Sequence, residues 1–328
     1  MKKFLIICTV FLVFNFSCKK ESGEEITPAT KTQPLDVVPM AHAAPRQFIV
    51  IDGKYNTSGN ADGNGLKALF NRPLSIFVNA DGSLLVADHD NGLIRKIKSD
   101  TVVSTLHFPM VKNGVSFEGA FPLDVAETTD GAIGITGTVD TPDFNFYYGL
   151  WVFNPNGQSA GYSVQPHSNG IEYGGIDKDV NGGYFWYTGD TGVSTISSTG
   201  TGYSSNTTNN VNGGREFGFG DLSSCSNGVK YIIQGAGLYK LTKEGVLARI
   251  LKNLSFNNIS SICASTGGDK LYIADNGVIK VISNMSAATA SVTTLLSGQE
   301  VSYIALSNSE KYLYFTSSAH HTVNKLTL

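Results

Sequence analysis

A motif that recurs six times between residues 74 and 328 constrains this chain more than any other feature. Each copy has an apolar stretch, a polar turn and a second apolar stretch, as in residues 74–78, 79–83 and 84–88. Successive turns lie 40–51 residues apart, and their central positions are Gly82, Gly131, Gly182, Gly228, Gly268 and Glu310. A tight hairpin turn needs a positive φ, which Gly adopts without steric cost. The pattern therefore predicts six β-hairpins.

Further apolar stretches follow each hairpin. Third stretches occupy residues 93–97, 150–153, 193–196, 238–241, 278–281 and 323–326. Fourth stretches occupy residues 102–106, 162–164, 202–203, 246–250 and 292–295. Four short strands in a repeat of this length are typical of a β-propeller blade. The alternative is a β-sandwich with an additional hairpin.

The sixth copy ends one strand short, because the chain stops at Leu328 after the third stretch. An unmatched strand is available near the other end, at residues 48–51. If this segment completes the last blade, the ring closes and leaves fewer unpaired sheet edges. We therefore predict an all-β, six-bladed β-propeller of four-stranded antiparallel blades over residues 46–328, closed by the N-terminal strand.

The first copy also resembles a known family. Residues 59–73, followed by residues 74–97 with Asn-Gly-Leu-Ile-Arg-Lys-Ile at 91–97, are similar to the NHL-repeat propellers. The resemblance is close in the first copy, moderate in the fifth, and limited to the strand pattern elsewhere. It implies a six-bladed propeller. Because families of this shape include binding scaffolds, lactonases and lyases, it does not define an activity.

The N-terminus resembles a bacterial lipoprotein signal. Lys2 and Lys3 precede an uncharged, largely apolar run at residues 4–17, and Cys18 follows. A run of this length is typical of a signal peptide and is short for a membrane span. We expect a signal peptide at 1–17, lipidation of Cys18, and a flexible tether at 18–45. The protein would then be an outer-membrane lipoprotein on the periplasmic or cell-surface side. The alternative is a secretory signal in which Cys18 has no role.

The charge balance argues against nucleic-acid binding. The chain has 24 Lys and Arg against 27 Asp and Glu, which gives a formal net charge of −3. Nucleic-acid binding depends on a basic surface that neutralises phosphates. We therefore expect no nucleic-acid partner. The expected contacts are with a membrane, through the lipid anchor alone, and with a glycan or an envelope protein.

Loops that join second to third strands lie on the same face of a propeller as the connections between blades. On this chain they carry histidines, carboxylates and many aromatic residues, including a predicted aromatic loop at 141–148. Aromatic rings stack on sugars or peptides while polar groups fix their orientation. The candidate ligand-binding residues are His89, Asp90, Phe144, Phe146, Tyr147, Tyr148, His167, Glu172, Tyr173, Arg215 and Phe217.

The sequence has no HExxH or P-loop motif. We therefore expect a non-catalytic binding module, with no catalytic residue, cofactor or metal. One alternative is a metal-assisted lactonase or lyase on the same face, using His89, His167 and Glu172. Another is a structural scaffold of a protein complex. Asp88 and Asp275 are expected to hydrogen-bond the backbone in turns, and Cys225 and Cys263 to be small buried residues without a disulfide.

Overall fold

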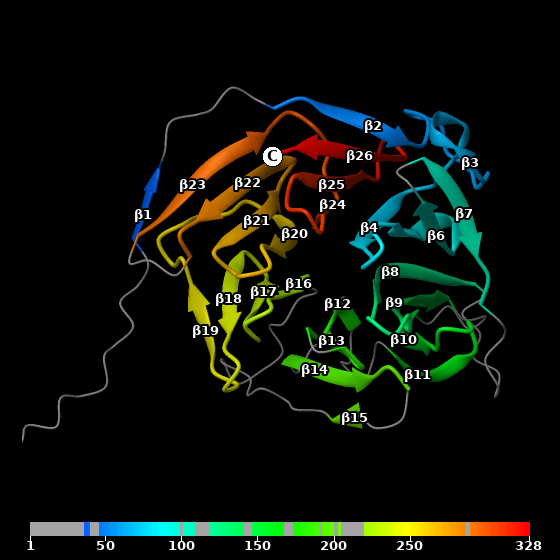
Figure 1. Cartoon of the computed structure of the whole chain (residues 1–328), viewed down its shortest axis with the longest axis horizontal. Helices are drawn as coiled ribbons and strands as arrows, with labels where there is room; N and C mark the ends of the chain where they lie inside the picture. The colour runs from blue at the N-terminus through cyan, green and yellow to red at the C-terminus, as the bar shows by residue number, and fades with distance from the viewer. Residues whose placement is uncertain are drawn as a thin grey trace, which may run out of the picture. The chain divides into compact units, whose positions relative to one another are not determined.

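Each of the six predicted repeats forms one antiparallel sheet in the computed structural model of the chain (Figure 1). Within residues 34–328, which form one unit, the innermost strands of consecutive sheets contact one another in chain order. The innermost strand of the sixth sheet contacts that of the first, so the ring closes. The fold is a six-bladed β-propeller. The structure describes residues 36–39, 46–98, 101–108, 119–140, 146–166, 173–180, 182–189, 192–199, 203–204, 220–285 and 289–328.

The first three blades follow the chain. Blade 1 contains β4 (Pro73–Val78), β5 (Leu84–Asp88), β6 (Leu93–Lys98) and β7 (Val102–Leu106), with β3 (Gly63–Asn64) on its outer edge. Blade 2 contains β8 (Ala120–Glu127), β9 (Ile133–Asp140), β10 (Phe146–Phe153) and β11 (Ser159–Pro166). Blade 3 contains β12 (Tyr173–Lys178), β13 (Tyr184–Gly189), β14 (Gly192–Ser197) and β15 (Tyr203–Ser204). The helical elements of the described residues are two 3₁₀ turns, η1 (Gly65–Lys67) and η2 (His89–Asn91).

The last three blades repeat the pattern. Blade 4 contains β16 (Leu222–Ser224), β17 (Lys230–Gln234), β18 (Gly237–Leu241) and β19 (Leu247–Ile250). Blade 5 contains β20 (Ile259–Ala264), β21 (Lys270–Asp275), β22 (Val278–Ser283) and β23 (Thr289–Leu296). Blade 6 contains β24 (Tyr303–Leu306), β25 (Tyr312–Ser317), β26 (Thr322–Thr327) and β2 (Phe48–Asp52).

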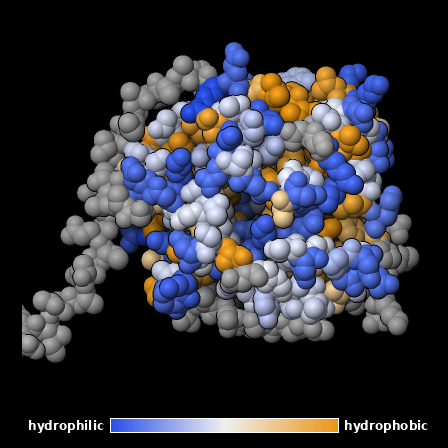
Figure 2. All heavy atoms as spheres, viewed as in Figure 1, coloured by the Kyte–Doolittle hydropathy of each residue, from blue (hydrophilic) through white to orange (hydrophobic). Residues whose placement is uncertain are grey.

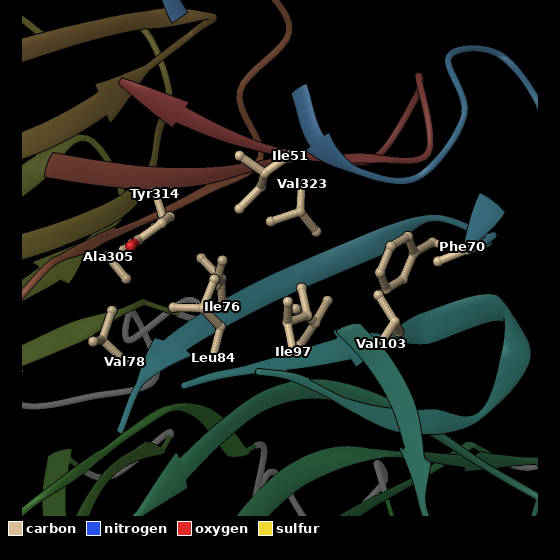
Figure 3. Close-up of a cluster of buried hydrophobic side chains, with 12 residues drawn as sticks. Ile51, Phe70, Ile76, Val78, Leu84, Ile97, Val103, Ala305, Tyr314 and Val323 are labelled. Atoms are coloured by element: carbon tan, nitrogen blue, oxygen red, sulfur yellow. The ribbon is translucent and has the colours of Figure 1, made fainter. Parts of the chain in front are cut away.

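Two N-terminal segments pair with the outer strands of the last blades. β2 is antiparallel to β26, with Phe48 opposite Leu326. Upstream, β1 (Asp36–Pro39) is parallel to β23 and lies within the range expected to be a tether. Ile51 of β2 is buried with Val323 of β26 and Phe70 in an apolar cluster between blades 6 and 1 (Figure 3). β2 therefore contributes both backbone hydrogen bonds and apolar packing where the two ends of the propeller meet.

The six turn positions identified in the sequence share one backbone conformation. The φ values are 81° at Gly82, 86° at Gly131, 74° at Gly182, 81° at Gly228, 75° at Gly268 and 54° at Glu310. The repeat therefore preserves a left-handed conformation even where Gly is replaced. Glu310 adopts it at a steric cost that Gly does not have.

Neighbouring blades are joined by threonines at one equivalent position. In blades 2, 3 and 6, a threonine of the second strand donates its hydroxyl to a backbone carbonyl at the inner strand of the next blade. The pairs are Thr136 with Gly174 (2.6 Å), Thr188 with Gly220 (2.6 Å) and Thr316 with Leu74 (2.7 Å). The last pair joins blade 6 to blade 1, so it contributes to ring closure together with the apolar cluster.

One local prediction is wrong. Residues 146–148, predicted to belong to an aromatic loop, are the first residues of β10. They pair with residues 138–140 of β9, and Tyr147 and Tyr148 also pair with β11. The third strand of blade 2 begins earlier than residue 150 because the aromatic residues continue the hairpin. Residues 141–145 lie outside the described residues.

Hydrophilic and hydrophobic side chains alternate over the face viewed in Figure 2. Among the described residues, no helical segment has the length and hydrophobicity that a membrane span requires.

Candidate functional site

A cavity of about 950 Å³ lies at the centre of the ring, and all six blades contribute to its lining. Its walls include the turn between β21 and β22 and the connection between β23 and β24. These are a second-to-third-strand turn and a blade-to-blade connection, so the cavity opens on the face that the sequence predicts to carry ligands. A concave site of this size accommodates a small organic ligand.

Two aspartates at the floor link neighbouring inner strands. Asp124, at a bulge of β8, accepts the N–H of Val125 (2.8 Å) and that of Ile176 in blade 3 (2.8 Å). Asp221, just before β16, accepts the N–H of Leu222 (2.7 Å) and that of Ile262 in blade 5 (2.8 Å). Each carboxyl group thus satisfies backbone donors that strand pairing leaves open at the centre of the ring.

Tyr303 of β24 lies between the two carboxyl groups. Its phenol oxygen is 2.8 Å from Oδ2 of Asp124 and also hydrogen-bonds Oδ1 of Asp221. A phenol has one proton to donate, so it satisfies only one of two ionised carboxylates. The other contact requires a proton on that carboxyl group. The three groups therefore share at least one carboxylic proton.

Burial is the main cause of the altered proton affinities. It raises the pKa of Asp124 to about 7, although hydrogen bonds from Ile176 and Tyr303 oppose the shift. Burial, and then the nearby charge of Asp124, raise the pKa of Asp221 well above its usual value. Burial likewise raises the pKa of the Tyr303 hydroxyl, which keeps the phenol neutral. These directions agree with a shared proton at neutral pH.

Three carboxamides line the blade 5 side of the cavity. Asn258 precedes β20, Asn276 lies in the β21–β22 turn, and Gln299 lies in the connection to blade 6. The N–H of Asn276 donates to the carbonyl of Asn258 (3.0 Å), which holds the two residues side by side. None of the three side chains hydrogen-bonds a residue that the structure describes. Their donors and acceptors are therefore available to a ligand.

The opposite side of the cavity is more apolar. Tyr148 of blade 2 lines it together with Leu123, and Leu74 of blade 1 lies next to them. In a six-membered ring blade 2 faces blade 5, so Tyr148 and Leu123 face Asn258 and Asn276. The cavity thus presents an apolar wall with an aromatic ring against a hydrogen-bonding wall.

The predicted candidates separate into four groups. Tyr148 lines the cavity, and Tyr147 lies next to it in β10. Phe146 and Tyr173 belong to strands, but their side chains are not described. Five predicted ligand contacts and the lipidation site lie outside the described residues. These are Phe144, Glu172, Arg215, Phe217, His167 and Cys18.

His89 and Asp90 are not among the residues that line the central cavity. Nδ1 of His89 is 2.8 Å from Oδ1 of Asp90, and its ring packs against Phe121. Burial lowers the pKa of His89, although the contact with Asp90 opposes the shift. Asp90 also pairs with Arg72 (3.2 Å) and lines a separate cavity of about 570 Å³ between blades 1 and 2. His89 and Asp90 therefore lie in a polar cluster at the edge of this face.

The residues expected to have structural roles form the expected backbone hydrogen bonds or are buried without a disulfide. Asp88 accepts the N–H of Asn71 (2.7 Å) and pairs with buried Arg95 (2.8 Å). Asp275 accepts the N–H of Asn257 and that of Asn258, both at 2.9 Å. Cys225 and Cys263 are free and buried.

Asp124, Asp221, Tyr303 and the carboxamides were not predicted from the sequence. The equivalent inner-strand positions of the other blades are Ser75, Gly175 and Ser261, so the repeat gives no common residue type. The available signal was an aspartate directly before apolar inner-strand residues, with Asp124 before Val125 in blade 2 and Asp221 before Leu222 in blade 4. Within the described part of the chain, no group of three or more His, Cys, Asp or Glu could hold a metal ion.

No family model and no curated protein matches the chain. Its fold is similar to that of a protein of unknown function from Bacteroides thetaiotaomicron, with a TM-score of 0.61 and 14% identity over 85% of this chain and 75% of that chain. An auxiliary nutrient binding protein from Bacteroides ovatus has a TM-score of 0.61 and 13% identity over 85% of this chain and 76% of that chain.

A gluconolactonase from Xanthomonas campestris is also similar, with a TM-score of 0.55 and 13% identity over 92% of this chain and 99% of that chain. At these identities the likeness shows the fold alone. The chain therefore belongs to the structural class of six-bladed β-propellers, whose members include both binding proteins and enzymes.

Proposed function

We propose that this protein is a binding module that holds a glycan in its central cavity. The observation that supports this most is the pairing of an apolar wall around Tyr148 with a wall of three carboxamides. A sugar ring has an apolar face and a rim of hydroxyl groups. It would stack on the tyrosine while its hydroxyls exchange hydrogen bonds with Asn258, Asn276 and Gln299.

The auxiliary nutrient binding protein from Bacteroides ovatus is consistent with this role, since it shares the fold. We further propose that the propeller is of the NHL type and is anchored to the outer membrane through lipidated Cys18. The NHL proposal rests on the resemblance of residues 59–97 to that repeat. The anchor proposal rests on the signal-like pattern that ends at Cys18. Incorporation of labelled palmitate by the wild type, and its loss in Cys18→Ala, would test the anchor.

Glycan binding is tested by applying the purified full-length chain to a glycan array. The double variant Asn258→Ala/Asn276→Ala should lose at least tenfold in affinity for any glycan retained, because two hydrogen-bonding side chains are removed. Tyr148→Ala should also weaken binding. Asn156→Ala is the matched control, since Asn156 is an exposed asparagine of the β10–β11 turn outside the cavity lining. Equal binding by all four proteins would contradict a site in this cavity.

Co-purification and metal analysis of the same protein distinguish the two alternative functions. If no glycan is retained while an envelope protein co-purifies in a fixed ratio, the scaffold role is supported instead. If purified protein contains a stoichiometric metal ion, the metal-assisted enzyme is favoured.

A further inference from the structure

The described residues that line the central cavity include acidic side chains but no basic side chain. This lining includes Asp124, Asp221 and Glu300, and contains no Lys, Arg or His. Asp124, Asp221 and Tyr303 share at least one proton, as derived above, so together they contribute at most one negative charge. Glu300 is the other acidic side chain of the described lining.

Glu300 lies in the connection between β23 and β24, where neutral donors hold its carboxylate. Oε1 accepts the hydroxyls of Ser302 (2.6 Å) and Ser318 (3.1 Å). Oε2 accepts the hydroxyl of Ser317 and the N–H of Ala319 (3.3 Å). These four donors hold the carboxyl group of Glu300 in a fixed position at the cavity lining. No Lys, Arg or His among the described residues forms an ion pair with Glu300, so its charge is not compensated.

The position of Glu300 makes this charge relevant to a bound ligand. Glu300 is half-buried and lines the cavity next to Gln299, one of the carboxamides proposed to contact the glycan. Charges act more strongly within a cavity walled by protein than in water, because the effective dielectric constant is lower. A ligand carboxylate or sulfate there would be repelled by Glu300, whereas a neutral hydroxyl would not be repelled and an ammonium group would be attracted.

We propose that Glu300 is a specificity-determining residue that makes the cavity reject anionic ligands, so that its glycan is neutral or carries a protonated amine. This inference rests on the proposed function and narrows it: uronic acids and sulfated sugars are excluded. Negative selection of this kind works through an unfavourable interaction with the wrong ligand.

The test uses matched pairs on the array, each a neutral glycan beside its uronic acid or sulfated counterpart. Wild type should bind the neutral member at least tenfold more tightly. Glu300→Gln should reduce that preference to threefold or less, mainly by improving binding of the anionic member. Glu244→Gln is the control, because Glu244 is an exposed carboxylate of the blade 4 turn outside the lining. It makes the same change in net charge and should leave the preference unaltered.

A second measurement needs no variant. Raising NaCl from 0.05 to 0.5 M should narrow the wild-type preference, since salt screens repulsion between charges. If Glu300→Gln does not fold, this salt dependence still tests whether negative charge in the cavity causes the preference, and a preference unaffected by salt overturns the inference.

The outcomes are distinguishable. Equal binding of neutral and anionic members by wild type, or a preference unaffected by both Glu300→Gln and salt, would overturn the inference and leave glycan binding in place. If no glycan binds at all, both the proposed function and the inference fail.

Discussion

The phenol oxygen of Tyr303 lies 2.8 Å from Oδ2 of Asp124, although the two residues are 179 positions apart in the sequence. Because Asp221 hydrogen-bonds the same oxygen, residues from blades 2, 4 and 6 meet at one point. Asp124 and Tyr303 also line a cavity of about 360 Å³ that includes inner-strand residues of several blades. The cluster thus separates two cavities, and forms the floor of the larger one.

This cluster predicts a dependence of stability on pH. Burial raises the pKa of Asp124 to about 7, from about 3.9 in an unfolded chain, so folding takes up a proton between these values. The contribution to stability is complete below about pH 4 and is lost as the pH rises towards 7, at up to about 1.4 kcal/mol per pH unit.

Chemical denaturation of wild type and Asp124→Asn between pH 4 and 8 measures this effect. Asp124→Asn cannot take up the proton, so its free energy of unfolding should fall less steeply with pH than that of wild type. Comparison of the two slopes removes the contributions of other carboxylates, such as Asp62 and Asp81, whose pKa values are lowered. Parallel curves would mean that Asp124 is ionised throughout.

Arg95 provides a second prediction. Its side chain and that of Asp88 are fully buried, and Nη1 of Arg95 is 2.8 Å from Oδ2 of Asp88. Nη2 also pairs with Asp62 (2.7 Å), whose carboxylate accepts the N–H of Thr105. Arg95→Met should destabilise the protein by about 3–5 kcal/mol, because it leaves a buried carboxylate without its partner.

A double variant identifies the cause of that loss. Asp88→Asn/Arg95→Met removes both charges, so it should be more stable than Arg95→Met alone when urea unfolding of the two is compared. The loss of stability in the double variant is also compared with the losses in Arg95→Met and Asp88→Asn measured singly. If it equals their sum, the uncompensated charge is not the source of the loss.

The fold could be predicted because its determinants are local and repeated. Glu310 was assigned to a turn despite not being Gly, since apolar stretches flank it at the repeat spacing, and its φ of 54° agrees. The centre of the ring could not be predicted in the same way. Asp124, Asp221 and Tyr303 differ in residue type and are brought together only by closure of the ring. Tyr148 was predicted because an aromatic residue on this face stands out in a single sequence, whereas the asparagines that face it resemble ordinary turn residues.

Glu310 offers a test of the repeat at the backbone level. A left-handed φ costs a residue with a Cβ about 1–2 kcal/mol relative to Gly. Glu310→Gly and Glu310→Ala both lose the hydrogen bond that Glu310 accepts from the N–H of Thr266 (2.8 Å). Their difference therefore isolates the backbone, and the Gly variant should be more stable by about 1 kcal/mol in thermal or urea unfolding.

Ser309 is the matched control, because it lies in the same turn and is not among the described residues with a positive φ. There the order should reverse, with Ser309→Ala at least as stable as Ser309→Gly. An Ala variant as stable as the Gly variant at position 310 would show that this turn relaxes to a different conformation.

The last prediction concerns the strand that pairs with the C-terminal end of the propeller. Ile51 of β2 is 8% exposed and packs with Val323 of β26, whereas Ile49 of the same strand is 62% exposed. Ile51→Ala should cost about 2–4 kcal/mol, since it opens a cavity in a buried cluster. Ile49→Ala should change the free energy of unfolding by less than about 0.5 kcal/mol, as expected at a surface position. Both substitutions remove the same atoms from the same strand, so urea unfolding of the pair separates packing from strand propensity. Equal and small losses would mean that β2 does not hold blades 6 and 1 together in solution. Closure of the ring would then depend on the hydrogen bond from Thr316 to Leu74 and on the direct contacts between the inner strands of these blades.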